Sequence, residues 1–122
     1  MRTSLIAAAL VILTTGGVLA AQDQVYKAGE GIKTPVLIRE VKPNYTKAAM
    51  DRKVQGKVEV DAVVLKDGTV GDVIVTKSLD EDLDQEAVKA TKLWTFRPGT
   101  NDGQPVAVRV NIELTFTLRD KK

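Results

Sequence analysis

The stretch that decides the fold is residues 54–77, VQGKVEVDAVVLKDGTVGDVIVTK. Valine or alanine stands at positions 58, 60, 62 and 64, and a charged residue stands at 57, 59 and 61. This alternation is typical of a half-buried strand. Asp67-Gly68 then favours a tight turn, and β-branched residues resume over 70–77. The stretch predicts a β-hairpin with a two-residue loop. The predicted register pairs Val64 with Gly71, Ala62 with Val73 and Val60 with Val75.

Helix signals lie on both sides of this hairpin. Good helix formers after an Asn/Thr entry predict a short helix over 44–52. After the hairpin, Ser78 and Glu81 form a Ser-x-x-Glu capping box, which predicts the start of a second helix. The apolar stripe of that helix consists of Leu83, Ala87, Ala90 and Trp94. We expect this stripe to cover one face of the sheet.

The last element is a long amphipathic strand over 106–118. Every even position in it is Val, Ile, Leu or Phe, and most odd positions are polar. At about 3.4 Å per residue the strand spans roughly 44 Å, so part of it must bend or project beyond the hairpin. The predicted fold class is α+β, with a small three-stranded antiparallel sheet (the hairpin plus the long C-terminal strand) packed on two helices.

Composition restricts the chemistry. The chain has 122 residues, and 18 Lys and Arg against 16 Asp and Glu give a net charge of +2. This near balance argues against a nucleic-acid partner, which needs a dense basic surface. Histidine and cysteine are absent, which removes imidazole and thiolate catalysis, disulfides and the usual zinc, copper and haem ligands. We therefore expect no enzyme activity, cofactor, metal or small-molecule substrate.

The N-terminus predicts a signal peptide. Arg2 supplies a positive start, residues 5–13 are apolar, and Val18-Leu19-Ala20 favours cleavage after Ala20. The alternative is an uncleaved inner-membrane anchor, although a spanning helix needs about 20 apolar residues. We expect a periplasmic protein that contacts a membrane only if this segment is uncleaved. The predicted organisation is a signal peptide at 1–20, a flexible lead-in with a short strand at 21–42, a domain at 43–119 and a basic tail at 120–122.

This order of elements resembles the C-terminal domain of TonB, the protein of Gram-negative bacteria that couples the inner membrane to outer-membrane transporters. The resemblance runs from residue 43 to about residue 118 and rests on seven short motifs in order. They are Pro43-x-Tyr45, Gly56-x-Val58, Asp67-Gly68-x-Val70, Leu83-Asp84 with Ala87 and Ala90, Trp94-x-Phe96-x-Pro98, Gly103-x-Pro105-Val106, and the terminal Phe116. Each motif alone is weak, but seven in this order and spacing are a strong signal.

The resemblance implies a role in TonB-dependent transport by protein binding. In that family the domain binds a short extended peptide, the TonB box of a transporter, as an added strand beside its last strand. An exposed strand edge suits this, because its unpaired N–H and C=O groups accept a partner strand. The implied partner-binding residues are Val108, Arg109, Val110, Asn111, Ile112 and Glu113, with Pro43, Tyr45 and Met50. The alternative is a self-associating envelope protein, in which the same strand pairs with its own copy in a homodimer.

Two positions depart from the family pattern. Thr46 stands where a proline is usual, and Met50 aligns with a glutamine that contacts the transporter. The chain also lacks a Pro-rich spacer and the membrane-helix histidine used for energy coupling. We therefore expect a stand-alone periplasmic module or adaptor.

The other motif residues are predicted to be structural. Gly56 relieves crowding or marks a bulge, and Trp94 with Phe96 fills the core. For Pro43 and Tyr45, a core lid and a surface contact both remain open. The structural set is Gly56, Asp67, Gly68, Leu83, Ala87, Ala90, Trp94, Phe96, Pro98, Gly103 and Phe116.

Overall fold

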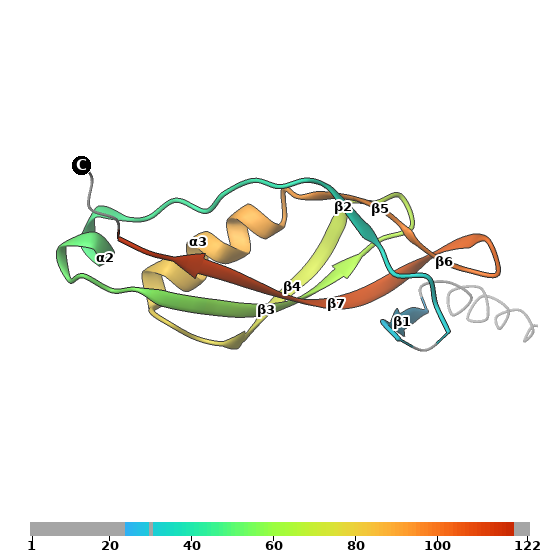
Figure 1. Ribbon diagram of the computed structural model, residues 1–122, viewed down its shortest axis with the longest axis horizontal. Coiled ribbons are helices and arrows are strands. Elements are labelled where there is room, and N and C mark those ends of the chain that lie inside the picture. The colour runs from blue at the N-terminus through green and yellow to red at the C-terminus, as the bar shows by residue number, and fades with distance from the viewer. Residues whose placement is uncertain (1–23, 30, 119–122) are drawn as a thin grey trace, which may run out of the picture.

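The computed structural model describes residues 24–29 and 31–118, so the predicted signal peptide and basic tail lie outside the described residues. The main sheet has the strand order β1-β7-β3-β4, with β6 paired to the first part of β7, and β2 and β5 form a separate two-stranded sheet. Figure 1 shows α3 lying across the sheet and α2 at one end of the molecule. In chain order the elements are β1 (Val25–Lys27), β2 (Val36–Arg39), α2 (Lys47–Asp51), β3 (Gly56–Val64), β4 (Val70–Lys77), α3 (Glu81–Thr91), β5 (Thr95–Arg97), β6 (Gly99–Asn101) and β7 (Gln104–Phe116).

The hairpin of β3 and β4 forms with a different turn from the predicted one. Ala62 pairs with Val73 and Val60 with Val75, as predicted. Next to the turn, however, Val64 pairs with Val70, one residue earlier than predicted. The Leu65 N–H donates to the Thr69 carbonyl at 2.8 Å, which leaves a loop of three residues instead of two. A bulge on β4 absorbs the difference and restores the predicted register.

The α+β class is confirmed, but the sheet is larger than the predicted three strands. β1 joins β7 in parallel, and β6 joins it in antiparallel orientation. β2 and β5 pair with each other. The region 21–42, predicted as a flexible lead-in with one short strand, therefore contributes two strands. β1, β5 and β6 have three residues each, which is too short for an alternating pattern to identify them.

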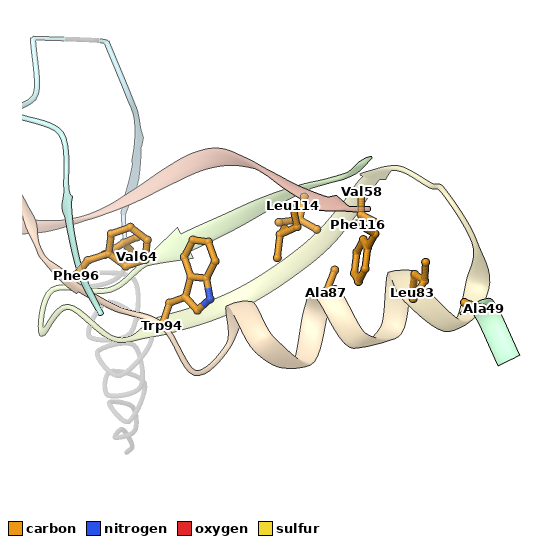
Figure 2. Close-up of a cluster of buried hydrophobic side chains, with 10 residues drawn as sticks. Ala49, Val58, Val64, Leu83, Ala87, Trp94, Phe96, Leu114 and Phe116 are labelled. Carbon is orange, nitrogen blue, oxygen red and sulfur yellow. The ribbon is translucent and has the colours of Figure 1, made fainter. Parts of the chain in front are cut away.

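The core lies between the sheet and α3, as the apolar stripe predicts. Leu83, Ala87 and Ala90 are buried on α3, and Trp94 is buried just after it. Figure 2 shows Leu83, Ala87 and Trp94 facing side chains of β3 and β7. The sheet contributes Val58, Val60, Val64, Leu114 and Phe116 to the same cluster. Because apolar burial is the main favourable term in folding, this layer holds β7 in place.

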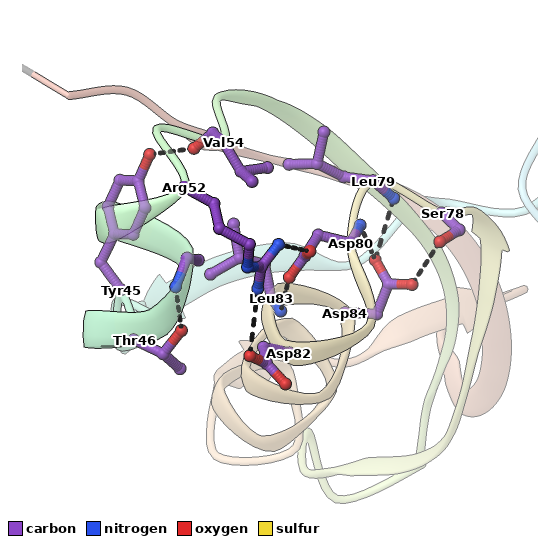
Figure 3. A network of polar contacts seen from close by, with 11 residues as sticks. Tyr45, Thr46, Arg52, Val54, Ser78, Leu79, Asp80, Asp82, Leu83 and Asp84 are labelled. Atoms are coloured by element: carbon purple, nitrogen blue, oxygen red, sulfur yellow. Dashed lines mark hydrogen bonds and ion pairs between the residues drawn. The ribbon is translucent and has the colours of Figure 1, made fainter.

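The predicted capping box at the start of α3 was wrong in detail. The N-cap is Asp80, whose carboxylate accepts the Leu83 N–H at 3.2 Å. Ser78 instead donates its hydroxyl to Asp84, and the Leu79 N–H donates to the same carboxylate at 3.0 Å (Figure 3). Asp84 therefore reaches back to the residues that follow β4. The N-cap of α3 lies two residues later than predicted, at Asp80 instead of Ser78.

An ion pair links α2 to the start of α3. Arg52 contacts Asp80 at 2.6 Å and Asp82 at 3.3 Å (Figure 3). The hydrogen bond from Arg52 and then that from the Leu83 N–H lower the pKa of Asp80 against the opposing effect of desolvation. The same hydrogen bond raises the pKa of Arg52. The folded state therefore favours the ionised form of Asp80.

Asp80→Asn is expected to lower the melting temperature by a few degrees at pH 7, because asparagine keeps the cap but loses the charge that faces Arg52. A carboxylate whose pKa is lowered in the folded state stabilises the fold at pH values above its pKa in the unfolded state, about 3.9. This contribution is lost as the pH falls through the folded-state pKa. The difference between variant and unchanged chain should therefore shrink as the pH falls below about 4. Thermal unfolding from pH 7 to pH 2 measures it, and a difference that does not shrink over this range would contradict the ion-pair explanation.

Candidate strand-edge site

The long strand β7 is paired along both sides over only part of its length. On one side β3 pairs with it from Val108 to Phe116. On the other side β1 pairs with residues 107–109. Within residues 24–29 and 31–118, no strand pairs with β7 on that second side from Val110 to Phe116. We call residues 110–116 the open edge.

Strand geometry shows which backbone groups face the open edge. Peptide groups alternate in direction along a strand. The Leu65 N–H points to the β4 side, since it donates to Thr69, so the groups of Val64 and every second residue before it point to β7. Their partners are Val108, Val110, Ile112, Leu114 and Phe116. The intervening residues of the open edge, Asn111, Glu113 and Thr115, therefore direct their N–H and C=O groups outward.

A groove of about 280 Å³ runs beside this edge. One wall is formed by Glu113–Thr115 of β7, and the other by residues 40–43, called the strap, which leads from β2 toward α2 (Figure 1). Trp94 also lines the groove. Its indole N–H donates to the Val41 carbonyl at 2.7 Å and ties the strap to the end of α3. The lining residues are Glu40, Lys42, Pro43, Trp94, Glu113, Leu114 and Thr115.

Two polar side chains of the open edge, those of Asn111 and Glu113, are engaged with β3. The Asn111 amide donates to the Asp61 carboxylate at 3.0 Å. Lys57 forms an ion pair with Glu113 at 3.4 Å, and both side chains are more than half exposed. Among the described residues no cluster of Asp or Glu is placed to hold a metal ion. The outward N–H and C=O groups of Asn111, Glu113 and Thr115 are of the kind that pair with a peptide backbone.

The predicted edge residues divide into two groups. Val110, Asn111, Ile112 and Glu113 lie on the open edge. Val108 and Arg109 are paired with Tyr26 and Lys27 of β1, so the open part begins two residues later than predicted. The edge there is covered because β1, whose sequence carries no strand pattern, packs against it in the folded chain.

The three residues predicted near the Pro-x-Tyr motif have different positions. Pro43 lines the groove. The Tyr45 ring packs edge-on against Phe116 with centroids 5.4 Å apart, and its hydroxyl donates to the Val54 carbonyl (Figure 3). Tyr45 is thus a lid on the core. Met50 lies on α2, 41% exposed, and is not among the groove residues.

Sequence reasoning missed two charged residues of the strap, Glu40 and Lys42. The available signal was the group of three charged residues, Arg39, Glu40 and Lys42, immediately before Pro43, which is typical of a solvent-exposed segment. It also assigned Trp94 only to the core, whereas the ring both packs there and lines the groove.

No helix among the described residues is long and apolar enough to cross a membrane. The family model of the Gram-negative bacterial TonB protein C-terminal matches residues 41–118. Protein TonB of Vibrio cholerae is 34% identical over 89 residues, which cover 71% of this chain and 36% of that protein. Protein TonB of Xanthomonas campestris is 39% identical over 77 residues, which cover 62% of this chain and 34% of that protein. The chain thus spans about a third of the length of these relatives.

The fold is similar to a solved structure. The solution NMR structure of the Pseudomonas aeruginosa TonB CTD aligns with a TM-score of 0.60 at 24% sequence identity. The alignment covers 82% of this chain and all of that one.

Proposed function

This chain belongs to the family of Gram-negative bacterial TonB protein C-terminal domains, and we propose that it is a periplasmic module that binds an envelope protein by adding a partner strand to β7. The proposed partner is the TonB box of an outer-membrane transporter, and the proposed process is TonB-dependent transport. The observation that carries the proposal is the open edge at residues 110–116, with the groove beside it. The periplasmic location rests on the signal-peptide pattern at residues 1–20.

Backbone pairing supplies most of the affinity in this proposal. Three residues of the open edge each present one donor and one acceptor, and a hydrogen bond of this kind contributes about 0.5–1.5 kcal/mol net. Such pairing makes little demand on the partner's side chains. Register then comes from the groove, where Glu40 and Lys42 on the strap and Glu113 on β7 provide charges of both signs.

Asn111→Pro is expected to weaken binding of a synthetic TonB-box peptide by about threefold to tenfold, the loss of one backbone hydrogen bond. Proline removes the first outward N–H of the open edge, but it takes no hydrogen bond from the β3 ladder. Isothermal titration calorimetry measures the effect, and circular dichroism checks that the variant is folded.

The matched control is Asn111→Ala. It removes the side-chain bond to Asp61 but keeps the backbone N–H, so its affinity should stay within about twofold of the unchanged chain if the main chain carries the binding. Unchanged binding by a folded Asn111→Pro variant would exclude the open edge as the site. Light scattering with and without peptide tests the alternative, since a tight dimer that is indifferent to peptide would favour self-association through the same edge.

A further inference from the structure

We propose that β1 is a stop that limits the partner segment to the seven residues of the open edge, 110–116. This inference rests on the proposed function. It starts from the unusual position of β1, which is parallel to β7 and pairs Val25 with Ala107, Tyr26 with Val108 and Lys27 with Arg109. β1 thus occupies the same side of β7 that the partner strand would use.

The segment that follows β1 is anchored at two points. Ile32 is 8% exposed and packs into the protein. Next to it, Lys33 and Thr100 exchange two backbone hydrogen bonds, at 2.9 and 3.0 Å. A side-chain contact of 3.5 Å joins Asn101 of β6 to the Tyr26 hydroxyl of β1. β1 is therefore held near β7 by a short stretch of chain fixed at its far end.

This anchoring makes displacement of β1 unfavourable for a partner strand. A partner that extended beyond Val110 would replace the pairs of β1 with β7 one for one, so it would gain no net hydrogen bonds. It would also lose the Tyr26 contact, and it would compete with a strand whose effective concentration is set by a tether of only a few residues. A longer partner should therefore end its pairing where β1 begins.

The stop has a consequence that can be measured as a dependence on peptide length. With β1 in place, the available edge has seven residues. If β1 were released, the available edge would run from Ala107 to Phe116 and have ten residues. The residue of β7 that would then be freed for outward pairing next to the open edge is Arg109. Peptides long enough to reach residues 107–109 of β7, which β1 covers, should gain affinity from this extra length only when β1 is released.

The first experiment uses the unchanged chain and needs no variant. Synthetic TonB-box peptides of about five, seven, nine and eleven residues, lengthened separately at either end, are titrated by calorimetry. Affinity should rise up to about seven residues and then stay within about twofold, since further residues find no free edge. A continued rise beyond seven residues would overturn the stop. If none of the peptides binds, the proposed function itself fails, and the stop fails with it.

The second experiment releases β1 with the double substitution Val25→Pro and Tyr26→Pro. Neighbouring N–H groups of a strand point to opposite sides, so two adjacent prolines remove one N–H that faces β7 and one that faces away. The pairing of β1 with β7 is therefore lost whichever of the two residues faces β7. The eleven-residue peptide should then bind about tenfold more tightly than the seven-residue one, and the seven-residue affinity should not change. The matched control, Val25→Ala with Tyr26→Ala, keeps both N–H groups and should bind both lengths equally. Equal affinities for the two lengths in the proline variant would contradict the proposal.

Discussion

Gly68→Ala is expected to destabilise the domain by about 3 kcal/mol or more, one of the largest effects of any single methyl group in this chain. A Cβ atom at residue 68 would lie 2.1 Å from the carbonyl oxygen of Phe96, and φ is +90° there. The obstacle is backbone, so it cannot move aside as a flexible side chain would. The close approach exists because the Phe96 N–H donates to the Gly68 carbonyl at 2.8 Å. Urea unfolding measures the loss.

Gly103→Ala provides the matched control for this prediction. Gly103 also has a positive φ, +82°, but an added Cβ would meet nothing within 4 Å. Its substitution therefore carries the conformational penalty alone, about 1–2 kcal/mol. The difference between the two variants measures how tightly the β3–β4 turn packs on β5. Equal losses would mean that the backbone at residue 68 moves to accommodate the methyl group.

The turn at Gly68 shows how far the sequence predicts this fold. Asp67-Gly68 and the alternation around it predict the hairpin, because both signals are local. The docking of the turn on β5 depends on a contact between residues 68 and 96, and no local pattern encodes it. The same holds for β1, β5 and β6, whose pairing is decided by their neighbours in the folded chain. Long periodic segments were therefore predicted, and three-residue strands were not.

The candidate site divides in the same way. The alternation over 106–118 predicts an amphipathic strand and identifies Asn111 and Glu113 as residues of its polar face. The groove, however, needs the strap, and the strap is placed by the Trp94 indole bond to the Val41 carbonyl, between residues 53 positions apart. The limit of the open edge likewise depends on β1. Sequence reasoning therefore identifies the strand that would bind the partner. It identifies neither the second wall of the groove nor the length of the open edge.

Phe116→Ala is expected to cost about 3–5 kcal/mol, because it removes a large buried side chain and leaves a cavity. Phe116 is the last residue of β7 and is 3% exposed. Its ring meets Tyr45 edge-on at 5.4 Å, and an aromatic pair of this kind adds about 0.5–1.5 kcal/mol beyond its buried area. Chemical denaturation measures the loss. Leu93→Ala is the control, since Leu93 is 64% exposed and its truncation should change stability by less than about 0.5 kcal/mol.

The same substitution connects the core to the proposed binding site. Tyr45 lies two residues after Pro43, so the ring of Phe116 helps to hold the end of the strap that forms one wall of the groove. A double-mutant cycle of Tyr45→Ala and Phe116→Ala should therefore show coupling in stability. Phe116→Leu, which keeps much of the buried volume but loses the aromatic contact, should remain folded and bind a TonB-box peptide more weakly than the unchanged chain. If it binds with unchanged affinity, the position of the strap does not contribute to binding, and the open edge of β7 acts without its second wall.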